Sequence, residues 1–334
     1  MARRRKAENE WLPERVYPGK SAYEFRPDKH TCIRLCPIDS PRRMVLKRHA
    51  EELARYSVIE NSFEHLTDLF MQSPAFADLS PRTQKDYRRY NKTVQKVFGR
   101  MQADMIKPEH IRRYMDIRGQ STKVQANREH SFMSKVFSWA YERGHVPTNP
   151  CHKVRKFTEE SRTRYIEDWE YQAVFDSANT WVQAAMEISY CCGARQGDVL
   201  DLKHEQLLEE GIYIKQGKTN KAQIKRWSPR LRTAIKLLRQ HTRVSNRTYL
   251  FVDEYGQRIT GHKLRQWWRK ARSDGEAAAR ENGHPGASFD FTFHDIKAKS
   301  ISDWDGDKQQ FSGHKTRAQV EVYDRKIPVV DTHK

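Results

Sequence analysis

The C-terminal part of the chain contains side chains that could together attack a phosphodiester. His294 and Lys297 stand three positions apart. His314 follows a Ser-Gly pair, and Tyr323 lies nine positions further on. A tyrosine hydroxyl can act as a nucleophile that becomes covalently attached to its substrate, while histidines and cations take up its proton and stabilise the charge that grows on the phosphate. These residues predict a phosphodiester transesterification that needs no metal ion and no cofactor.

Two cations upstream could complete such a site. Arg195 precedes Asp198 at the start of a helix that we expect over residues 196–203. We interpret Arg195 as a phosphate clamp that Asp198 orients; the alternative is a simple ion pair at the start of the helix. Lys218 stands on a glycine-bearing turn between two strand-like runs, 212–215 and 223–227. A lysine on a turn is ordinarily solvent-exposed, so the turn alone assigns no role to Lys218.

In order and spacing, these elements resemble the active site of the tyrosine recombinases, and of the phage integrases in particular. The resemblance implies that Tyr323 is the nucleophile, which leaves a 3′-phosphotyrosine and a free 5′-hydroxyl. It also implies that Lys218, rather than Lys221, protonates the leaving oxygen and that His294 accepts the tyrosine proton. Four side chains would stabilise the phosphorane: Arg195, His294, Lys297 and His314.

The sequence departs from this family at one position. The family most often has an arginine three residues after the first histidine, whereas this chain has Lys297. Lysine supplies a point charge in place of the planar fork of arginine, so we expect an active site that is differently tuned. Lys299 is the competing candidate, but it lies two positions further round the expected helix and should face away.

Composition points to a nucleic-acid partner. The formal net charge of the 334-residue chain is +19 and its pI is about 9.7, which favours binding to a polyanion. The five cysteines form no CxxC pair and indicate reduced thiols in a cytosolic protein. The resemblance to phage integrases implies that this cytoplasm is that of a bacterial host cell, where the protein would associate with the nucleoid. His30, Cys32 and Cys36 form at most a partial metal-ligand set, so we expect no metal site there. We expect neither a membrane span nor a secretory signal.

Residues 1–57 are expected to form an N-terminal DNA-binding module. Three short strand-like runs, 15–17, 21–26 and 31–36, are separated by turn-forming residues and followed by an expected helix over 41–56. This order of features resembles the arm-binding domain of the lambda-type phage integrases. A basic run precedes the strands and could be either a solvated tail or a groove-binding arm; it consists of Arg3, Arg4, Arg5 and Lys6.

Residues 58–149 are expected to form a helical core-binding domain with four helices. Ser80 and Pro81 mark the start of the second helix, and we expect Gly119 to stop the third before a fourth begins near Thr122. Basic side chains repeat along one side of the second helix, where they either form a solvated face or contact DNA phosphates. We favour phosphate contacts for this set: Lys85, Arg88, Arg89 and Lys92.

A polar, basic linker over 150–164 then leads to a catalytic domain over 165–334 that ends in a tail. We therefore predict a multidomain protein, mainly α with small β elements: a three-stranded arm-binding module, a helical core-binding domain and a mixed α+β catalytic domain. In the family, tails of this kind dock on a neighbouring protomer.

The expected function is site-specific DNA recombination by a phage-type integrase that catalyses integration and excision of a mobile element. The expected partners are double-stranded attachment-site DNA, three further copies of the chain in a homotetramer, and DNA-bending accessory proteins. One alternative is a type IB topoisomerase or resolvase, against which the N-terminal module argues. The other is a non-catalytic DNA-binding regulator on a recombinase scaffold, for which Lys297 is the supporting feature.

Overall fold

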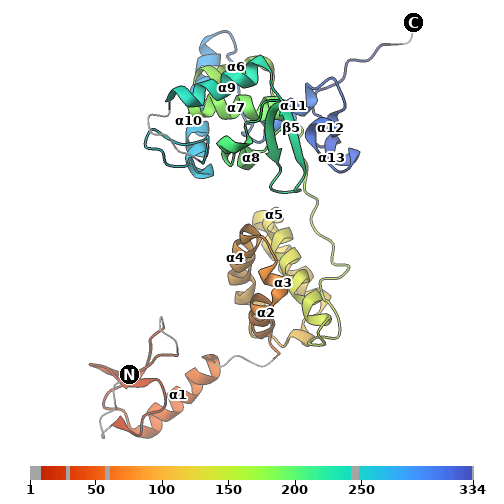
Figure 1. Ribbon diagram of the computed structural model, residues 1–334. Helices are drawn as coiled ribbons and strands as arrows, with labels where there is room; N and C mark the ends of the chain where they lie inside the picture. Colours follow the sequence, from red (N-terminus) through yellow and green to blue (C-terminus); the bar gives the residue numbers. More distant parts are fainter. Residues whose placement is uncertain (1–8, 28–30, 57–60, 242–247, 333–334) are drawn as a thin grey trace. The chain divides into compact units, whose positions relative to one another are not determined.

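The computed structural model describes residues 9–27, 31–56, 61–241 and 248–332, and the chain divides into two compact units, Met1–Glu159 and Glu160–Lys334 (Figure 1). The predicted DNA-binding residues Arg3, Arg4, Arg5 and Lys6 lie outside the described residues, as does His30. None of the helices within these ranges is long and apolar enough to cross a lipid bilayer.

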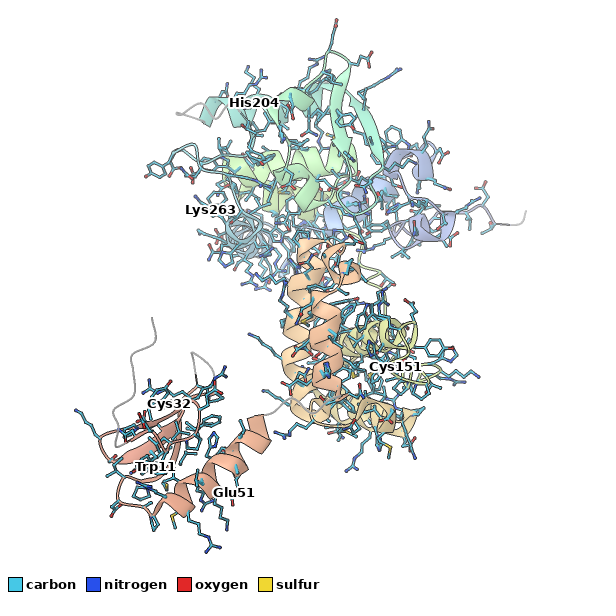
Figure 2. The ribbon with its side chains drawn as sticks, turned by 60° about the horizontal axis from the view of Figure 1, so that its bottom comes forward. Trp11, Cys32, Glu51, Cys151, His204 and Lys263 are labelled. Atoms are coloured by element: carbon cyan, nitrogen blue, oxygen red, sulfur yellow. The ribbon has the colours of Figure 1, made fainter. Side chains whose placement is uncertain are left out.

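The N-terminal module is a three-stranded antiparallel sheet with one helix. Its strands are β1 (Val16–Pro18), β2 (Ala22–Phe25) and β3 (Ile33–Pro37), in the order β1-β2-β3, and the helix is α1 (Arg42–Tyr56). Val45 of α1 is fully buried against the apolar face of the sheet. Trp11, labelled in Figure 2, closes one side of this small core, with the Arg42 guanidinium 5.0 Å from its ring centroid. The three predicted strands are confirmed.

The second module of this unit is a helical domain. Its elements are α2 (Phe63–Gln72), α3 (Pro74–Ala77), α4 (Pro81–Phe98), the 3-10 turn η2 (Ala103–Met105) and α5 (Pro108–Tyr141). The Ser80 hydroxyl accepts a hydrogen bond from the Thr83 amide, so α4 begins at the predicted cap. Buried aromatic and aliphatic side chains of α2, α4 and α5 form a single core.

The predicted division of this segment into two helices is confirmed, but the break lies at Thr122, where the fourth helix is expected to begin, and not at Gly119. A side chain at position 119 would collide with the Phe157 ring, to which a Cβ would approach within 2.4 Å. The glycine therefore serves close packing against a segment that follows much later in the sequence. The helix is interrupted only at Thr122, whose backbone is non-helical. Across this kink, buried Glu129 accepts hydrogen bonds from Tyr114 and Arg118.

The second unit is built around helix α7 (Thr180–Cys192). The other helices are α6 (Asp168–Asp176), α8 (Gln196–Leu200), α9 (Pro229–His241), α10 (Gly261–Glu281), α11 (Asp295–Ser302), α12 (Lys308–Ser312) and α13 (Arg317–Glu321). α9, α10 and α11 all pack against α7, and α6 packs along α10. A two-stranded hairpin, β4 (Gly211–Lys215) and β5 (Ala222–Arg226), follows the 3-10 turn η3 (His204–Gln206).

Helix α8 ends at Leu200 and does not extend over the whole of the predicted range 196–203. The reason is a competing pairing: the Leu202 carbonyl accepts a hydrogen bond from the Leu250 amide at 2.9 Å, and Lys203 pairs with Tyr249 as an isolated β-bridge. An extended segment more than forty residues away thus takes up the backbone groups that a longer helix would have used.

Candidate active site

Arg195 stands at the junction between α7 and α8. Gly193 ends α7 in the left-handed conformation, with φ of 58°, and so turns the chain toward α8. The Arg195 guanidinium donates to the Gln216 side-chain oxygen at 2.8 Å and lies 3.9 Å from the Asp198 carboxylate. Its side chain is only 16% exposed, and one of its five N–H donors is used in the hydrogen bond to Gln216. This arrangement leaves the guanidinium able to bind an anion.

The β4–β5 turn is held in place by hydrogen bonds to Asp198 and Gln216. The Asp198 carboxylate accepts a hydrogen bond from the Gly217 amide at 2.9 Å, which ties the turn to α8. Lys218 and Lys221 on this turn are both exposed, and the charge of each acts on His314. The turn therefore places two cations beside the site, and the preference for Lys218 stays a prediction.

Lys297 lies on the buried side of α11. Its side chain is 0% exposed, and its ammonium group has no hydrogen-bond partner among the described residues. Burial, together with the neighbouring Arg195 and Lys225 cations, lowers the pKa of Lys297 to about 7, although Asp198 partly opposes this shift. A buried, unpaired cation is costly, and a phosphate oxygen is the kind of partner that it lacks.

The competing candidate, Lys299, faces the other side of α11. Its ammonium group donates to the Tyr165 hydroxyl at 3.0 Å and forms ion pairs with Asp168 and Asp303. With three protein acceptors, this lysine has no need of a phosphate. Lys297 and Lys299 therefore differ in surroundings as the helical periodicity predicts.

His314 follows a glycine that fixes the end of α12. Gly313 has φ of 70°, and a Cβ there would lie 2.7 Å from the Gln216 amide nitrogen, so only glycine fits without strain. His314 Nδ1 lies 2.8 Å from the Ser312 hydroxyl, and Nε2 is buried without a partner in the part of the chain that is described. Burial and the nearby cations, first among them Lys297, lower the pKa of His314 to about 4, so the ring is neutral at physiological pH.

Tyr323 follows α13 and lies between the two histidines. Its hydroxyl is 3.3 Å from His294 Nε2, and its ring stacks on His314 with centroids 4.9 Å apart. The Lys297 ammonium is 5.7 Å from the centroid of the same ring. Loss of hydration, reinforced by the positive charge of Lys297 and Arg195, lowers the pKa of His294, which favours the neutral ring that a proton acceptor needs. The structure therefore brings Tyr323 together with His294, Lys297 and His314.

The predicted DNA-binding residues of the helical domain lie on α4. Lys85, Arg88, Arg89 and Lys92 are all exposed on its surface. Arg88 also lies over the Phe76 ring, with its guanidinium 5.0 Å from the centroid, and Arg89 forms an ion pair with Asp86 at 3.2 Å. Their spacing of three or four residues places them on one face of the helix.

Sequence reasoning missed Gln216 and Arg325 as parts of the site. Buried Gln216 accepts from Arg195 and donates to the Ser312 carbonyl at 2.8 Å, so it joins the two ends of the site. Arg325 donates to the buried Asp295 carboxylate at 2.6 Å. Both contacts join segments far apart in the sequence, and no local spacing indicates them.

Two family models match the chain. The model of the phage integrase family matches residues 164–326, and that of the phage integrase central domain matches residues 63–157. The integrase of Escherichia phage HK022 is 26% identical over 211 residues, which are 58% of this chain and 56% of that protein. The integrase of Enterobacteria phage 434 is 30% identical over 92 residues, 27% of this chain and 26% of that protein. The chain thus spans about half the length, or less, of the curated relatives it matches.

Solved structures of integrases share the fold. A lambda integrase dimer bound to a COC′ core site matches with a TM-score of 0.65 at 18% identity, covering 99% of this chain and all of that one. The Tn1549 transposon integrase in complex with circular intermediate DNA matches with a TM-score of 0.63 at 10% identity, covering 80% of this chain and 96% of that one. The predicted fold class, mainly helical with small sheets, is confirmed by these likenesses.

Proposed function

Because the chain belongs to the phage integrase family, whose members are tyrosine recombinases, we propose that it is a site-specific DNA recombinase that breaks and rejoins strands at attachment sites. One observation carries the proposal: the Tyr323 hydroxyl lies 3.3 Å from His294, while the unpaired ammonium of Lys297 is buried beside the same ring. A nucleophile, a proton acceptor and a cation without a protein partner are the groups that phosphoryl transfer to a protein hydroxyl requires.

The proposed reaction assigns each of these groups a role. The Tyr323 oxygen attacks the scissile phosphorus, its proton passes to His294, and the bond from phosphorus to the 5′-oxygen breaks. Lys218 gives the leaving oxygen its proton, so the products are a 3′-phosphotyrosine and a free 5′-hydroxyl. Attack by the 5′-hydroxyl of another strand reverses each transfer and releases the tyrosine. No energy source is consumed, because the phosphotyrosine conserves the energy of the phosphodiester.

Charge in the pentavalent transition state would be borne by four side chains, of which His294 also accepts the tyrosine proton. Arg195 and Lys297 supply positive charge from two different helices, and His314 adds a hydrogen-bond donor through its unpartnered Nε2. Asp198 holds the turn that presents Lys218. These interactions strengthen as charge develops on the phosphate, which is why they accelerate the chemical step more than they tighten DNA binding.

Recombination would take place in a complex of several copies on DNA. A lambda integrase tetramer bound to a Holliday junction shares 18% identity with the chain and matches it with a TM-score of 0.64 over 91% of its length. Exchange of strands between two duplexes involves four cleavage sites, so we propose a homotetramer, with DNA-bending proteins as accessory factors. The proposed setting is the cytoplasm of a bacterial host, where the reaction would integrate and excise a phage genome.

The first test concerns the nucleophile. Tyr323→Phe should abolish covalent attachment, by more than about 10⁴-fold, because the phenyl ring offers no oxygen to attack with. A core-site duplex with a nick near the cleavage position traps the covalent complex, which a denaturing gel resolves. Binding of the same duplex should stay within twofold of wild type. Covalent complex formed by Tyr323→Phe would refute the assignment, and its absence from wild type would refute the proposed activity.

A further inference from the structure

Resting on the function proposed above, we propose that Arg325 is a positioning residue that latches the Tyr323 segment into the active site of its own protomer. It lies two positions after the nucleophile. Its backbone amide and its guanidinium both make contacts that fix where Tyr323 can be. The proposal assigns Arg325 no contact with DNA and no role in proton transfer.

The latch is a buried ion pair between two distant segments. The Arg325 guanidinium donates to the Asp295 carboxylate at 2.6 Å, and the two side chains are 7% and 1% exposed. The same guanidinium group donates to the Arg164 carbonyl at 3.1 Å. Thr292 donates to the other carboxylate oxygen through its amide at 2.7 Å and its hydroxyl at 2.8 Å. Although burial alone would raise the pKa of Asp295, the hydrogen bonds from Arg325 and Thr292 hold it below its usual value, so the pair is ionised.

Asp295 is also the residue directly after His294. It therefore locates both partners of the proposed proton transfer: it fixes the start of α11, which bears His294, and through Arg325 it fixes the segment that bears Tyr323. A displacement of about 1 Å between reacting groups can cost about 10²-fold in rate. An ion pair that ties the donor segment to the acceptor segment controls that distance.

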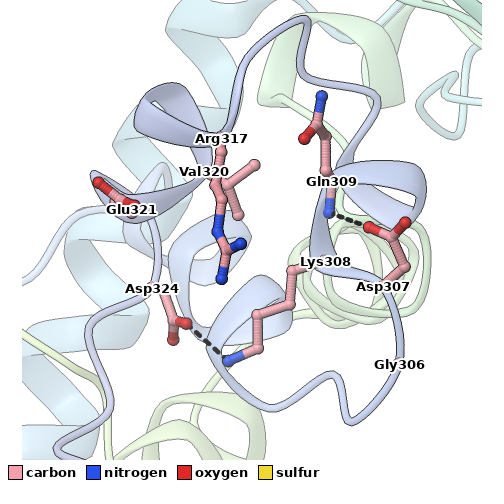
Figure 3. Close-up of a pocket in the computed structure, with 8 residues that line it drawn as sticks. All are labelled: Gly306, Asp307, Lys308, Gln309, Arg317, Val320, Glu321 and Asp324. Carbon is pink, nitrogen blue, oxygen red and sulfur yellow. Dashed lines mark hydrogen bonds and ion pairs between the residues drawn. The ribbon is translucent and has the colours of Figure 1, made fainter.

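Two further contacts reinforce the latch. The Ser302 hydroxyl donates to the Tyr323 carbonyl at 3.1 Å and accepts from the Arg325 amide at 2.7 Å. Beside Ser302, to whose carbonyl it also donates at 3.1 Å, Lys308 forms an ion pair with Asp324 at 2.8 Å. Both residues line a pocket of about 500 Å³, where Figure 3 shows the two side chains pointing toward each other. Each of the three residues 323, 324 and 325 is therefore held by α11, α12 or the segment between them.

Beyond Lys326, which lies 3.9 Å from the Asp303 carboxylate, the tail exposes apolar side chains. Ile327, Val329 and Val330 are 87%, 101% and 75% exposed. Arg325, whose side chain is 7% exposed, thus directly precedes a tail in which the described residues 326–332 are all exposed. A pull on that tail, such as its capture by another copy, would act on the short segment between the tail and Tyr323, which this ion pair anchors. The latch consequently keeps cleavage in cis while the tail is free to bind elsewhere.

A mixture of two disabled variants tests the proposal. Arg195→Gln keeps Tyr323 but has a defective pocket, and Tyr323→Phe keeps the pocket but has no nucleophile. Covalent DNA adducts from the mixture require a tyrosine of one protomer to enter the pocket of another, and a size tag on the first variant identifies its source. We expect no adduct above the level of each variant alone. When Arg325→Gln is added to the Arg195→Gln chain, the tagged adduct should appear.

The cis reaction supplies the second measurement. At saturating nicked duplex, Arg325→Gln should slow covalent attachment by about 10- to 100-fold, with the dissociation constant for the core site unchanged. Arg325→Lys should restore part of the rate, and Lys326→Gln is the matched control, since Lys326 is exposed and lies 3.9 Å from Asp303. If Arg325→Gln does not fold, Lys308→Gln, which removes the more exposed ion pair, should produce the same two effects at smaller size.

The proposal requires both the slower cis reaction and the tagged adduct from the mixture. A cis rate within twofold of wild type, or no tagged adduct from the mixture, would overturn the latch while leaving the proposed function standing. Failure of the wild-type chain itself to form covalent complex would instead contradict the proposed function, so the two failures are distinguishable.

Discussion

Two sets of cations in this molecule have the same residue types and opposite surroundings. Those on α4 are exposed along one helix face, where Lys85 and Lys92 extend into solvent. Those of the candidate site are enclosed: Lys297 is fully buried, and Arg195 is 16% exposed. Exposed cations can contribute many similar, additive contacts to a DNA backbone. A buried, unpaired cation is kept at a cost in stability, which makes sense where a single transition state provides its partner.

The same contrast occurs within one helix. Lys297 and Lys299 are both buried on α11, but within the described parts of the chain only Lys299 has hydrogen-bond acceptors: the Tyr165 hydroxyl and two carboxylates. Burial alone therefore does not mark a residue for chemistry. The informative combination is burial together with a missing partner.

Lys218 is an exception to the distinction between exposed cations that bind DNA and buried cations that act in the chemical step, because it is exposed and yet predicted to be the general acid. Lys218→Ala should slow cleavage by about 10²- to 10⁴-fold, the usual contribution of a positioned proton donor. A duplex with sulfur in place of the 5′ leaving oxygen should restore the rate, because a thiolate leaves without a proton. Single-turnover cleavage of both duplexes by Lys218→Ala and by the matched Lys221→Ala gives the answer. Rescue confined to Lys221→Ala would move the role to that residue.

Lys297→Ala should cause the next largest loss in cleavage rate, and it tests whether a buried cation acts mainly in the chemical step. Removal of a charge-stabilising donor from such a site costs about 10²- to 10³-fold in rate, while one phosphate contact among many contributes little to affinity. Lys297→Arg should keep substantial activity, since a guanidinium carries the same charge. Lys299→Ala is the control and should lower the thermal midpoint of unfolding more than the cleavage rate. Normal cleavage by Lys297→Ala together with slow cleavage by Lys299→Ala would reverse our assignment.

The pH dependence of cleavage should report the burial of Lys297. Its pKa is lowered to about 7, so the free protein loses this charge as the pH rises above 7. At subsaturating DNA, the ratio of the wild-type rate to the Lys297→Arg rate should fall by up to about tenfold per pH unit between pH 7 and 9. A ratio independent of pH would show that Lys297 stays charged in the free protein.

Stability gives a second measurement of the same group. In the unfolded chain the lysine titrates near its ordinary pKa of 10.5, so between pH 7 and 10.5 the unfolded state binds more protons than the folded state. The free energy of unfolding should therefore rise with pH across this window through Lys297, and the rise should be smaller in Lys297→Met, where the buried Lys225, whose pKa is lowered to about 8, still contributes.

The exposed cations of α4 should give the smallest effects. Lys92→Ala is expected to weaken core-site binding by less than about tenfold and to reduce the slope of log affinity against log salt by about one unit. The cleavage rate at saturating DNA should not change, because the residue makes no contribution to the transition state. Fluorescence anisotropy at several salt concentrations measures both quantities, and Glu109→Gln on α5 is a suitable exposed control. An unaltered salt slope would identify the α4 face as merely solvated.

Local signals in the sequence account for much of the fold. The Ser80-Pro81 start of α4 and the short N-terminal strands both involve interactions within a few residues, so spacing predicts them. The errors have a common cause. Gly119 looks like a helix end, but its role is set by Phe157, and the end of α8 is set by an extended segment near Leu250. Contacts of that range leave no periodic pattern.

In the candidate site, too, some features could be predicted from the sequence and others could not. The spacing of His294, Lys297, His314 and Tyr323 indicated that these residues share a site, and the structure brings them together. That Lys297 is without a hydrogen-bond partner among the described residues could not be read from spacing, because it depends on every segment packed around α11.

Gln216 couples the evolution of the Arg195 clamp to that of the segment that precedes His314. Its amide accepts from Arg195 and from Thr219 at 2.9 Å, and donates to the carbonyl of Ser312, two residues before His314. A single substitution at position 216 therefore changes contacts of both Arg195 and Ser312. The sequence around Arg195 and the sequence before His314 are consequently not free to change independently. Selection on random libraries should find position 216 strongly epistatic with both 195 and 313, so that changes tolerated singly at one position fail in combination with changes at another.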